Sequence, residues 1–387
     1  MIPYGRQDIS QADIDAVVAV LRSDFLTQGP AVPLFEKAVA AYCGAHHAVA
    51  VNSATSALHI ACLALGLGPG DWLWTSPNTF VASANSGLYC GAQVDFVDID
   101  PRTYNMCPQA LETKLLTAER EGRLPTVVMP VHLCGQPAEM QAIHALGQRF
   151  GFKIIEDASH AIGGKYRGEP IGNCRFSDVT VFSFHPVKII TTCEGGMALT
   201  NSPELADRMM RYRSHGITGD ASKMHPRRPD EIWNYQQIAL GFNYRMTDVQ
   251  AALGLSQMAR LDEFVRKRQA IARHYDHALA DLSLTTPWQH ADSYSSYHLY
   301  PIRLKLVEGQ QTQRRAYDAL HAQGILVNLH YIPVYRQPYY EALGFKEGYC
   351  PEAEQYFREA LSIPMYPAMS DAQVDEVTHR LRQTLDV

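Results

Sequence analysis

No stretch of the sequence approaches the roughly 18 consecutive apolar residues that a membrane-spanning helix needs. The first ten residues also lack the basic segment and apolar core that mark a secretory signal. Hydrophobic residues make up 46% and charged residues 19% of the 387 positions, which is ordinary for a soluble globular protein. We therefore expect a cytoplasmic protein, and the length predicts two domains.

The eight cysteines form neither a C-x-x-C pair nor a dense framework. In a chain this long, such scatter indicates free thiols in a reducing compartment and excludes a disulfide-stapled scaffold. The sixteen histidines show no ligand pairs at zinc spacing, and no H-E-x-x-H sequence occurs. The sequence therefore predicts that the protein has no metal site.

The chain has no excess of positive charge. Its 34 Lys and Arg residues stand against 40 Asp and Glu residues, which gives a formal net charge of −6. A nucleic-acid or anionic membrane partner would favour a basic face, so neither is expected. We interpret the short cluster Arg227-Arg228 as a solvated loop, because short charge clusters are usually solvated.

Short apolar runs alternate with helical patterns through the first 200 residues. The predicted strands are nearly all apolar, as is typical of strands covered by helices on both faces, and comprise residues 48–51, 94–97, 126–131, 153–155, 179–183 and 197–200. A proline or a capping residue begins, and a glycine ends, each of the predicted helices 33–42, 54–65 and 137–150. This alternation predicts an α/β domain with a large, mostly parallel sheet and helices on both faces.

The pattern changes near residue 217, where residues 217–237 are interpreted as a long loop. A long helix is predicted from about Thr247, because Thr247 and Gln250 match a capping box. Farther along, predicted strands alternate with predicted helices over residues 299–304, 312–323, 325–330 and 371–385. We therefore predict a large domain at 1–246 and a smaller α+β domain at 247–387.

Two predicted strands bring polar residues to one edge of the sheet. The first leads into Asp157, and the second ends at Ser183 and leads to Lys188. Ligands of open α/β sheets bind at the carboxyl ends of strands. Most lysines are simply solvated, but Lys188 stands among apolar residues. Burial would lower its pKa and make its amine a neutral nucleophile suited to Schiff-base chemistry.

Two further features fit the same chemistry. A pyridoxal ring needs a carboxylate at its pyridinium nitrogen to act as an electron sink, and Asp157 is placed for that role. Residues 52–57 precede a predicted helix, whose exposed N–H groups can bind a phosphate. That segment is weak evidence alone, because Ser and Thr are common N-caps. Together with Lys188 and Asp157, it predicts a site for pyridoxal 5′-phosphate.

Seven motifs follow one another along almost the whole chain. They are LTQGP (26–30), NSATSAL (52–58), EDASHAIG (156–163), SFHPVK (183–188), TTCEGG (191–196), GFNYRMTDVQAALG (241–254) and HYIPVY (330–335). In content and spacing they resemble the DegT/DnrJ/EryC1/StrS sugar aminotransferases, which have the fold of type I pyridoxal-phosphate enzymes. The resemblance implies a homodimer with shared active sites that binds pyridoxal 5′-phosphate and aminates a nucleotide-linked keto sugar.

Three of these segments, NSATSA, DASHA and SFHPVKIITT, are most similar to the branch of the family that serves pseudaminic acid biosynthesis. This similarity implies transfer of the amino group of L-glutamate to C4 of a UDP-linked 4-keto-6-deoxy-N-acetyl sugar. Another UDP- or dTDP-linked 4-keto-6-deoxy sugar stays open as the acceptor.

The resemblance also implies roles for individual residues. Lys188 would bind the cofactor aldehyde and then carry protons, and Asp157 would pair with the pyridinium nitrogen. The other cofactor contacts would be Ala54, Thr55, Phe80, His160, Ser183 and, from a second subunit, Asn243. The sugar-nucleotide pocket would be lined by Tyr4, Asp24, Phe25, Leu26, Thr27, His330 and Tyr331.

Two positions depart from the commonest family pattern. His160 stands where many members have glutamine, and either side chain can hydrogen-bond the ring oxygen. Cys193 stands where many have glycine, which puts the backbone freedom after the lysine in question. Two other functions stay open. A sugar dehydratase of the same fold would carry histidine in place of Lys188, and a pyridoxal-phosphate-binding regulator would be expected to carry a DNA-binding motif that this chain lacks.

Overall fold

The computed structural model describes residues 1–225, 231, 233–305 and 312–385 of the chain. Within them, the central element is a seven-stranded sheet with the strand order β2-β10-β9-β6-β5-β3-β4. In that order the strands are His47–Val51, Gly196–Thr200, Val179–Ser183, Lys153–Asp157, Val127–Met129, Trp72–Thr75 and Gln93–Phe96. The cluster Arg227-Arg228 lies outside the described residues.

Pairing in this sheet is mostly parallel. From β9 to β4 every neighbouring pair of strands runs parallel, whereas β10 runs antiparallel to both β2 and β9. The predicted fold class, an α/β protein with a large and mostly parallel sheet, is therefore confirmed. Strand β3 is the one member of the sheet that the apolar runs do not predict.

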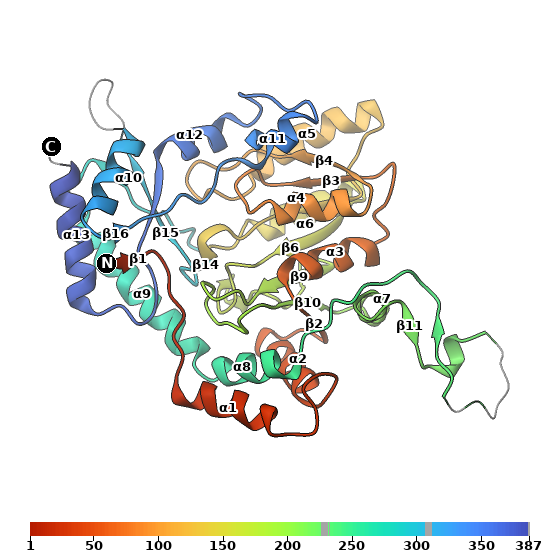
Figure 1. Ribbon diagram of the computed structural model, residues 1–387. Helices are drawn as coiled ribbons and strands as arrows, with labels where there is room; N and C mark the ends of the chain where they lie inside the picture. The colour runs from red at the N-terminus through yellow and green to blue at the C-terminus, as the bar shows by residue number, and fades with distance from the viewer. Residues whose placement is uncertain (226–230, 232, 306–311, 386–387) are drawn as a thin grey trace.

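Helices cover both faces of the sheet (Figure 1). One face packs against α3 (Ala54–Ala64), α4 (Ala82–Tyr89) and α7 (Pro203–Arg213). The other packs against α2 (Ala31–Cys43), α5 (Pro108–Glu121) and α6 (Met140–Phe150). Ile155 of β6 enters the first core and Ile154 enters the second. Neighbouring residues of β6 therefore point to opposite faces, as the strand period of two requires.

The C-terminal part of the chain is built around a three-stranded antiparallel sheet. This sheet joins β13 (Leu284–Thr285), β15 (Tyr300–Leu304) and β17 (Ala360–Ile363). It packs against α9 (Leu261–Ala278), α10 (Gln313–Ala322) and α13 (Asp371–Leu385) in a core of its own. The N-terminal strand β1 (Ile2–Pro3) pairs in parallel with β16 (Ile325–Leu326), so the first residues of the chain join this part.

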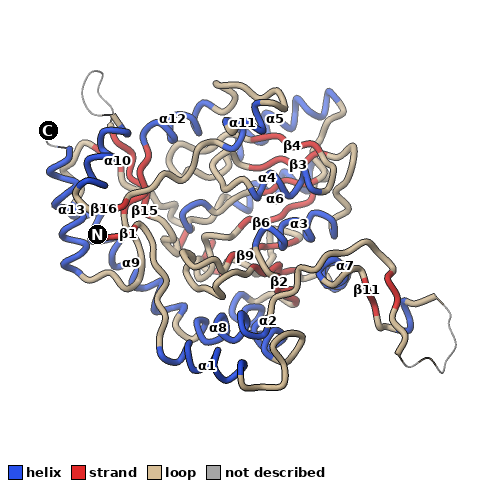
Figure 2. The backbone as a smooth tube through the Cα atoms, viewed as in Figure 1, coloured by secondary structure: helices blue, strands red, loops and turns tan. Residues whose placement is uncertain are grey.

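The remaining elements connect these layers. They are α1 (Gln11–Leu21), η1 (Leu133–Gly135), β7 (Lys165–Tyr166), β8 (Glu169–Pro170), β11 (Ile217–Thr218), η2 (Ala221–Lys223), β12 (Gln236–Gln237), α8 (Asp248–Met258), β14 (Ser293–Tyr294), η3 (Val334–Arg336), α11 (Pro338–Glu341) and α12 (Pro351–Glu359). Strands β11 and β12 pair within the segment predicted as a loop. Figure 2 shows this hairpin as an arm that projects from the body of the subunit.

The predicted long helix from residue 247 is divided in two. The capping box of Thr247 and Gln250 is present and begins α8, but α8 ends at Met258 and α9 begins at Leu261. The break lies at Arg260, whose guanidinium forms ion pairs with Asp8 and Asp13 of the N-terminal segment. The proposed domain boundary at residue 247 stays a prediction.

Candidate active site

A cavity of about 430 Å³ lies at the carboxyl ends of the parallel strands β6 and β9. Of the residues predicted for the site, those that line this cavity are Tyr4, Ala54, Thr55, Phe80, Asp157, His160, Ser183, Lys188, His330 and Tyr331. They come from both halves of the sequence, since the cavity lies where the N-terminal segment and the loop after β16 meet the edge of the large sheet. The structure therefore brings most of the predicted site together.

Lys188 follows β9 in a tight turn, where its backbone N–H donates to the carbonyl of His185 at 2.9 Å. Burial lowers the pKa of Lys188 to about 8, although the nearby Asp157 carboxylate opposes that shift. An amine with this pKa is neutral in about a tenth of molecules at pH 7, compared with fewer than one in a thousand for a free lysine. The side chain can therefore act as a nucleophile and exchange protons near neutral pH.

Asp157 ends strand β6 and turns its buried carboxylate toward the cavity. Ser83 of α4 donates its hydroxyl hydrogen to Oδ2 at 2.7 Å, and the backbone N–H of Ser159 donates to Oδ1 at 3.1 Å. These two hydrogen bonds fix the orientation of the carboxylate and leave it able to accept a further hydrogen bond from a ligand. Sequence reasoning missed Ser83, which lies three residues after Phe80 in the same stretch.

The N-terminus of α3 forms the polar end of the cavity. Ser53 caps this helix by accepting the backbone N–H of Ser56, and Ala54 and Thr55 line the cavity. Unpaired backbone N–H groups and the helix dipole favour an anion at such a position. Gly196 of β10 allows the close packing, because a Cβ there would lie 2.4 Å from the nitrogen of Ala54. This end of the cavity can hold a phosphate.

His160 is held in one tautomer. Its Nδ1 accepts the backbone N–H of Cys134 at 3.3 Å, so the proton lies on Nε2, which is 3.3 Å from the hydroxyl of Tyr331. Burial lowers the pKa of His160 well below its usual value, and the charge of Lys188 adds to the effect. The imidazole is therefore neutral at pH 7 and presents an N–H donor on the side of the cavity.

Three more histidines line the cavity, and two of them, His330 and His298, are buried. Burial lowers the pKa of His330 to about 3, and its ring lies 5.3 Å from that of Tyr4, centroid to centroid. His298 was not predicted; it lines the cavity with its ring centroid 4.3 Å from that of His160, and its buried Nδ1 has no partner among the described residues. The sequence around it offers no motif with a chemical meaning, so only the fold reveals it.

Phe80 is unusual because 60% of this large apolar side chain is exposed although it borders a cavity. Its ring lies 6.4 Å from that of Tyr331, centroid to centroid. An exposed aromatic face at a cavity suits stacking on a planar ligand ring. This position agrees with the stacking role predicted for Phe80.

Five predicted residues lie outside the cavity of their own subunit. Asn243 is exposed and forms a β-bridge with Ser214. Asp24, Phe25, Leu26 and Thr27 are exposed in the turn between α1 and α2, and the carbonyl of Leu26 accepts the N–H of Asp248. Their roles stay predictions, because a second subunit would be needed to test them.

Cys193 replaces the glycine of the commonest pattern and adopts φ = 66°. Few residues other than glycine take this left-handed conformation. The hydroxyl of Thr191 accepts the N–H of Cys193 at 2.9 Å and so supports the turn. The backbone after Lys188 thus keeps the shape that glycine would allow, at some cost in strain.

The arrangement fits pyridoxal 5′-phosphate. One cavity holds an amine of lowered pKa, a fixed carboxylate, a helix N-terminus and an exposed aromatic ring, which match the aldehyde, ring nitrogen, phosphate and ring face of that molecule. Over the described ranges, no group of three or more His, Cys, Asp or Glu side chains is placed to hold a metal ion. In that part of the chain, no helix combines the length and apolar character needed to cross a membrane.

Comparisons with known proteins agree with this geometry. The DegT/DnrJ/EryC1/StrS aminotransferase family matches residues 7–382. The spore coat polysaccharide biosynthesis protein SpsC of Bacillus subtilis is 39% identical over 384 residues, with 98% of this chain and 96% of SpsC covered. The UDP-4-amino-4,6-dideoxy-N-acetyl-beta-L-altrosamine transaminase of Campylobacter jejuni is 37% identical over 371 residues, with 96% and 94% covered.

Two solved structures confirm the fold class. Helicobacter pylori PseC, an aminotransferase involved in the biosynthesis of pseudoaminic acid, superposes with a TM-score of 0.90 at 30% identity and covers 100% of this chain and 99% of its own. The sugar aminotransferase Spr1654 of Streptococcus pneumoniae, in its PMP form, gives 0.89 at 30% identity, again covering 100% and 99%.

Proposed function

Since the chain belongs to the DegT/DnrJ/EryC1/StrS aminotransferase family, whose members depend on pyridoxal phosphate, we propose a specific amino transfer for it. The amino group of L-glutamate passes to C4 of a UDP-linked 4-keto-6-deoxy-N-acetyl sugar, in a route to pseudaminic acid. The names of the Campylobacter jejuni and Helicobacter pylori relatives support this acceptor. The observation that carries the proposal is the pairing of Lys188, with its pKa of about 8, and Asp157 in one cavity.

We assign the cofactor contacts by matching chemistry. Asp157 would bind the ring nitrogen, Phe80 the ring face and His160 the ring oxygen, while Ala54, Thr55 and Ser183 would bind the phosphate. When bound there, pyridoxal phosphate supplies an electron sink for the electron pair that remains when a C–H bond beside nitrogen breaks. Asp157 would keep the ring nitrogen charged, and this charge would make the sink effective.

Lys188 carries the proton transfers. Its pKa of about 8 lets the amine take a proton from a substrate carbon and return one near neutral pH. Burial keeps His160, His298 and His330 uncharged at that pH, so among the buried groups of the cavity the exchange of protons falls to Lys188. The tight turn after β9 holds the lysine at the strand end and so orients its amine toward the bound substrate.

We also propose a homodimer with shared active sites. The described residues that line the cavity include no arginine, and Lys188 is their one lysine, yet both proposed substrates carry anionic groups. The arm around β11 and β12 projects away from the body of its own subunit (Figure 2), and Asn243 follows β12 in the sequence. Trp233 and Leu240 beside this arm are 76% and 79% exposed, which favours burial against a second copy. Asn243 of the second copy would then reach the phosphate.

The acceptor has one alternative with an observation in its favour. The relative SpsC, which shares 39% identity, is a spore coat polysaccharide biosynthesis protein, so a different UDP- or dTDP-linked 4-keto sugar for a surface polysaccharide is the second candidate. A dehydratase of the same fold is disfavoured because Lys188 is present and buried at the strand end. We propose a cytoplasmic location, which the free state of all eight cysteines supports.

The test is a two-step assay of the purified protein. Added pyridoxal phosphate should give visible absorbance, and L-glutamate should then bleach it as the amine moves to the cofactor. A panel of UDP- and dTDP-linked 4-keto sugars should restore the absorbance, and NMR of the product should place the new amine at C4. Bleaching without recovery by any UDP-linked N-acetyl sugar would refute the proposed acceptor but leave the aminotransferase intact.

A further inference from the structure

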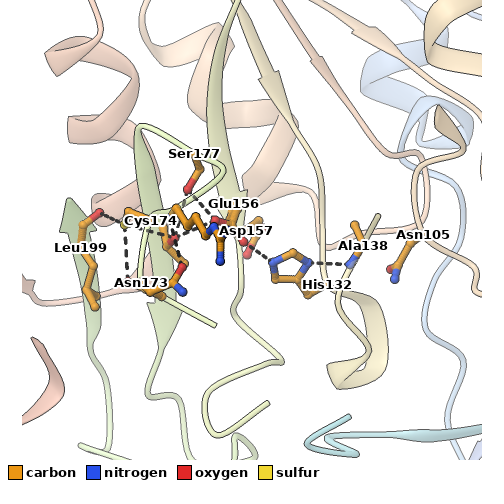
Figure 3. Close-up of polar contacts among 12 residues, drawn as sticks. Asn105, His132, Ala138, Glu156, Asp157, Asn173, Cys174, Ser177 and Leu199 are labelled. Carbon is orange, nitrogen blue, oxygen red and sulfur yellow. Dashed lines mark hydrogen bonds and ion pairs between the residues drawn. The ribbon is translucent and has the colours of Figure 1, made fainter. Parts of the chain in front are cut away.

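A carboxylate and an imidazole form a buried pair behind strand β6, on the side away from the cavity. Asp157 faces the cavity, so its neighbour Glu156 points to the opposite face, toward α6. Glu156 is 4% exposed and His132 is fully buried. Neither residue lines the cavity of the active site. Figure 3 shows His132 next to Glu156, with Asp157 beside Glu156 on the same strand.

The hydrogen bonds of this pair are complete and fix its protonation. The Nδ1 of His132 accepts the backbone N–H of Ala138 at 3.0 Å, so Nε2 carries the proton and donates to Glu156 at 2.7 Å. The other oxygen of Glu156 accepts the hydroxyls of Ser177 and Thr180. Burial alone would raise the pKa of Glu156, but these bonds, with that of His132 the largest, lower it below its usual value. The carboxylate is therefore ionised at neutral pH.

The imidazole of His132 closes a loop, residues 132–138. The backbone N–H of His132 donates to the carbonyl of Asp157 at 3.0 Å, which joins the start of the loop to β6. The side chain of His132 binds Ala138 at the end of the loop and Glu156 in the strand. One residue thus fixes both ends of the loop against the strand that delivers Asp157 (Figure 3).

The middle of this loop reaches the active site. Cys134 has φ = 61°, a strained value for a residue other than glycine, and in this conformation its N–H points to Nδ1 of His160 at 3.3 Å. This bond is what places the proton of His160 on Nε2, the nitrogen that faces Tyr331 and the cavity. The two neutral tautomers of a free imidazole are both populated, and one hydrogen bond shifts such an equilibrium about fivefold.

We propose that His132 and Glu156 are positioning residues of the active site. By holding loop 132–138 from behind the sheet, they present the N–H of Cys134 to His160 and so keep a hydrogen-bond donor on His160 directed into the cavity. The inference rests on the proposed function, because that donor acts on the ring oxygen of the bound cofactor. It gives a functional role to the buried hydrogen bonds of His132 and Glu156, which lie outside the cavity.

The experiment titrates the visible absorbance of the holoenzyme against pH in three variants. His132→Asn keeps an acceptor for Ala138 but is too short to donate to Glu156, whereas Glu156→Gln keeps the shape and removes the charge. His160→Asn withdraws the proposed donor, because the N–H of the shorter side chain cannot reach the position of Nε2. A donor on the ring oxygen draws electron density from it and so disfavours the protonated chromophore. Each variant should therefore raise the pKa of the absorbance change, by up to about one pH unit.

A matched control separates this effect from simple loosening of the core. Ser177→Ala removes another hydrogen bond to Glu156 but leaves loop 132–138 untouched, so it should lower thermal stability without moving the pKa of the absorbance. The groups that face Lys188 and bear on that pKa are Asp157, Cys134, His160, His298 and His330, and all are retained in the control.

A double variant decides whether the effect passes through His160. In the His160→Asn background, His132→Asn should cause no further shift, because the donor it orients is already gone. Equal shifts in both backgrounds would overturn the proposal, and so would unshifted absorbance in folded His132→Asn and Glu156→Gln proteins when His160→Asn does shift it. Wild-type protein that binds no cofactor would instead refute the proposed function.

Discussion

Strand β6 ends in two adjacent carboxylates, Glu156 and Asp157, which have different surroundings. Asp157 faces the cavity, is held by one hydroxyl and one backbone N–H, and can still accept a hydrogen bond from a ligand. Glu156 faces the opposite core, and both of its oxygens are bound by His132, Ser177 and Thr180. The comparison shows that reactive positions keep unused hydrogen-bonding capacity, whereas supporting positions have theirs filled within the protein.

The largest effect on the transamination rate should follow loss of the Lys188 amine from the cavity. Lys188→Ala should lower the transamination rate by about a thousandfold or more, because it removes both the nucleophile and the proton carrier. The melting temperature should hardly fall, since the amine makes no described hydrogen bond that supports the fold. Steady-state assays with glutamate and thermal melts check both results, and a variant of near wild-type rate would contradict the role of Lys188.

Comparing the reaction rates of the Asp157→Asn and Glu156→Gln variants tests whether the two carboxylates have different roles. The first change should lower the rate by about a hundredfold with little loss of stability, because the neutral amide cannot keep a ring nitrogen charged. The second should lower the rate far less. Parallel kinetic assays of the two variants measure the contrast. If the two changes slow the reaction equally, the division between a reactive and a supporting carboxylate is wrong.

The pKa of Lys188 should appear in the capture of the cofactor by the apoenzyme. Because burial lowers that pKa to about 8, the neutral amine should rise from about a tenth to about nine tenths of molecules between pH 7 and pH 9. The rate of capture should therefore rise about tenfold over that interval and then level off. Stopped-flow absorbance after mixing apoenzyme with pyridoxal phosphate measures it, and a rate that keeps climbing toward pH 10.5 would indicate a solvated lysine.

Glu156 should contribute to stability in a way that depends on pH. Its pKa is lowered in the folded protein, so its contribution is present above the unfolded value of about 4.3 and is lost as the pH falls through the lower folded value. At pH 7, Glu156→Gln should reduce the free energy of unfolding by about 1–3 kcal/mol. Denaturation with urea at several pH values should show this difference shrinking below about pH 4; a constant difference would mean that the charge is not involved.

The smallest effect concerns the turn after Lys188. Cys193 at φ = 66° carries strain that glycine would relieve, although glycine adds flexibility to the unfolded chain. Cys193→Gly should therefore change the free energy of unfolding by less than about 1 kcal/mol, whereas Cys193→Val should destabilise by about 1–3 kcal/mol because β-branched residues avoid this conformation. Chemical denaturation of the two variants distinguishes them, and equal stabilities would argue against strain at this turn.

Most strands of the sheet could be predicted from their apolar runs. Elements whose formation depends on packing against the rest of the fold could not. Strand β3 was missed although its four residues, WLWT, form an apolar run as long as others that were predicted. Helix α4 was missed because its sequence, ASANSGLY, has little helical preference of its own and forms by packing against β3 and β4. Helix α6 begins at Met140 and not at the predicted Pro137, since residues 137 and 138 belong to the loop that His132 closes and Glu139 is the N-cap.

The site divides in the same way. Lys188, Asp157 and the N-terminus of α3 could be found because each lies at or near the boundary of a predicted element. Ser83, His298 and the pair of His132 and Glu156 could not, because their partners lie far away in the sequence and meet only when the sheet is assembled. The roles of Asn243 and residues 24–27 depend on a second subunit.

The central claim is that the amine of Lys188 and the carboxylate of Asp157 hold one aldehyde cofactor between them, and borohydride tests it most directly. Reduction of the yellow holoenzyme, followed by tryptic digestion and mass spectrometry, should locate a phosphopyridoxyl group on the peptide that contains Lys188. The Asp157→Asn protein should carry the same label but bind the cofactor more weakly. A label on another lysine, or on none, would contradict the account.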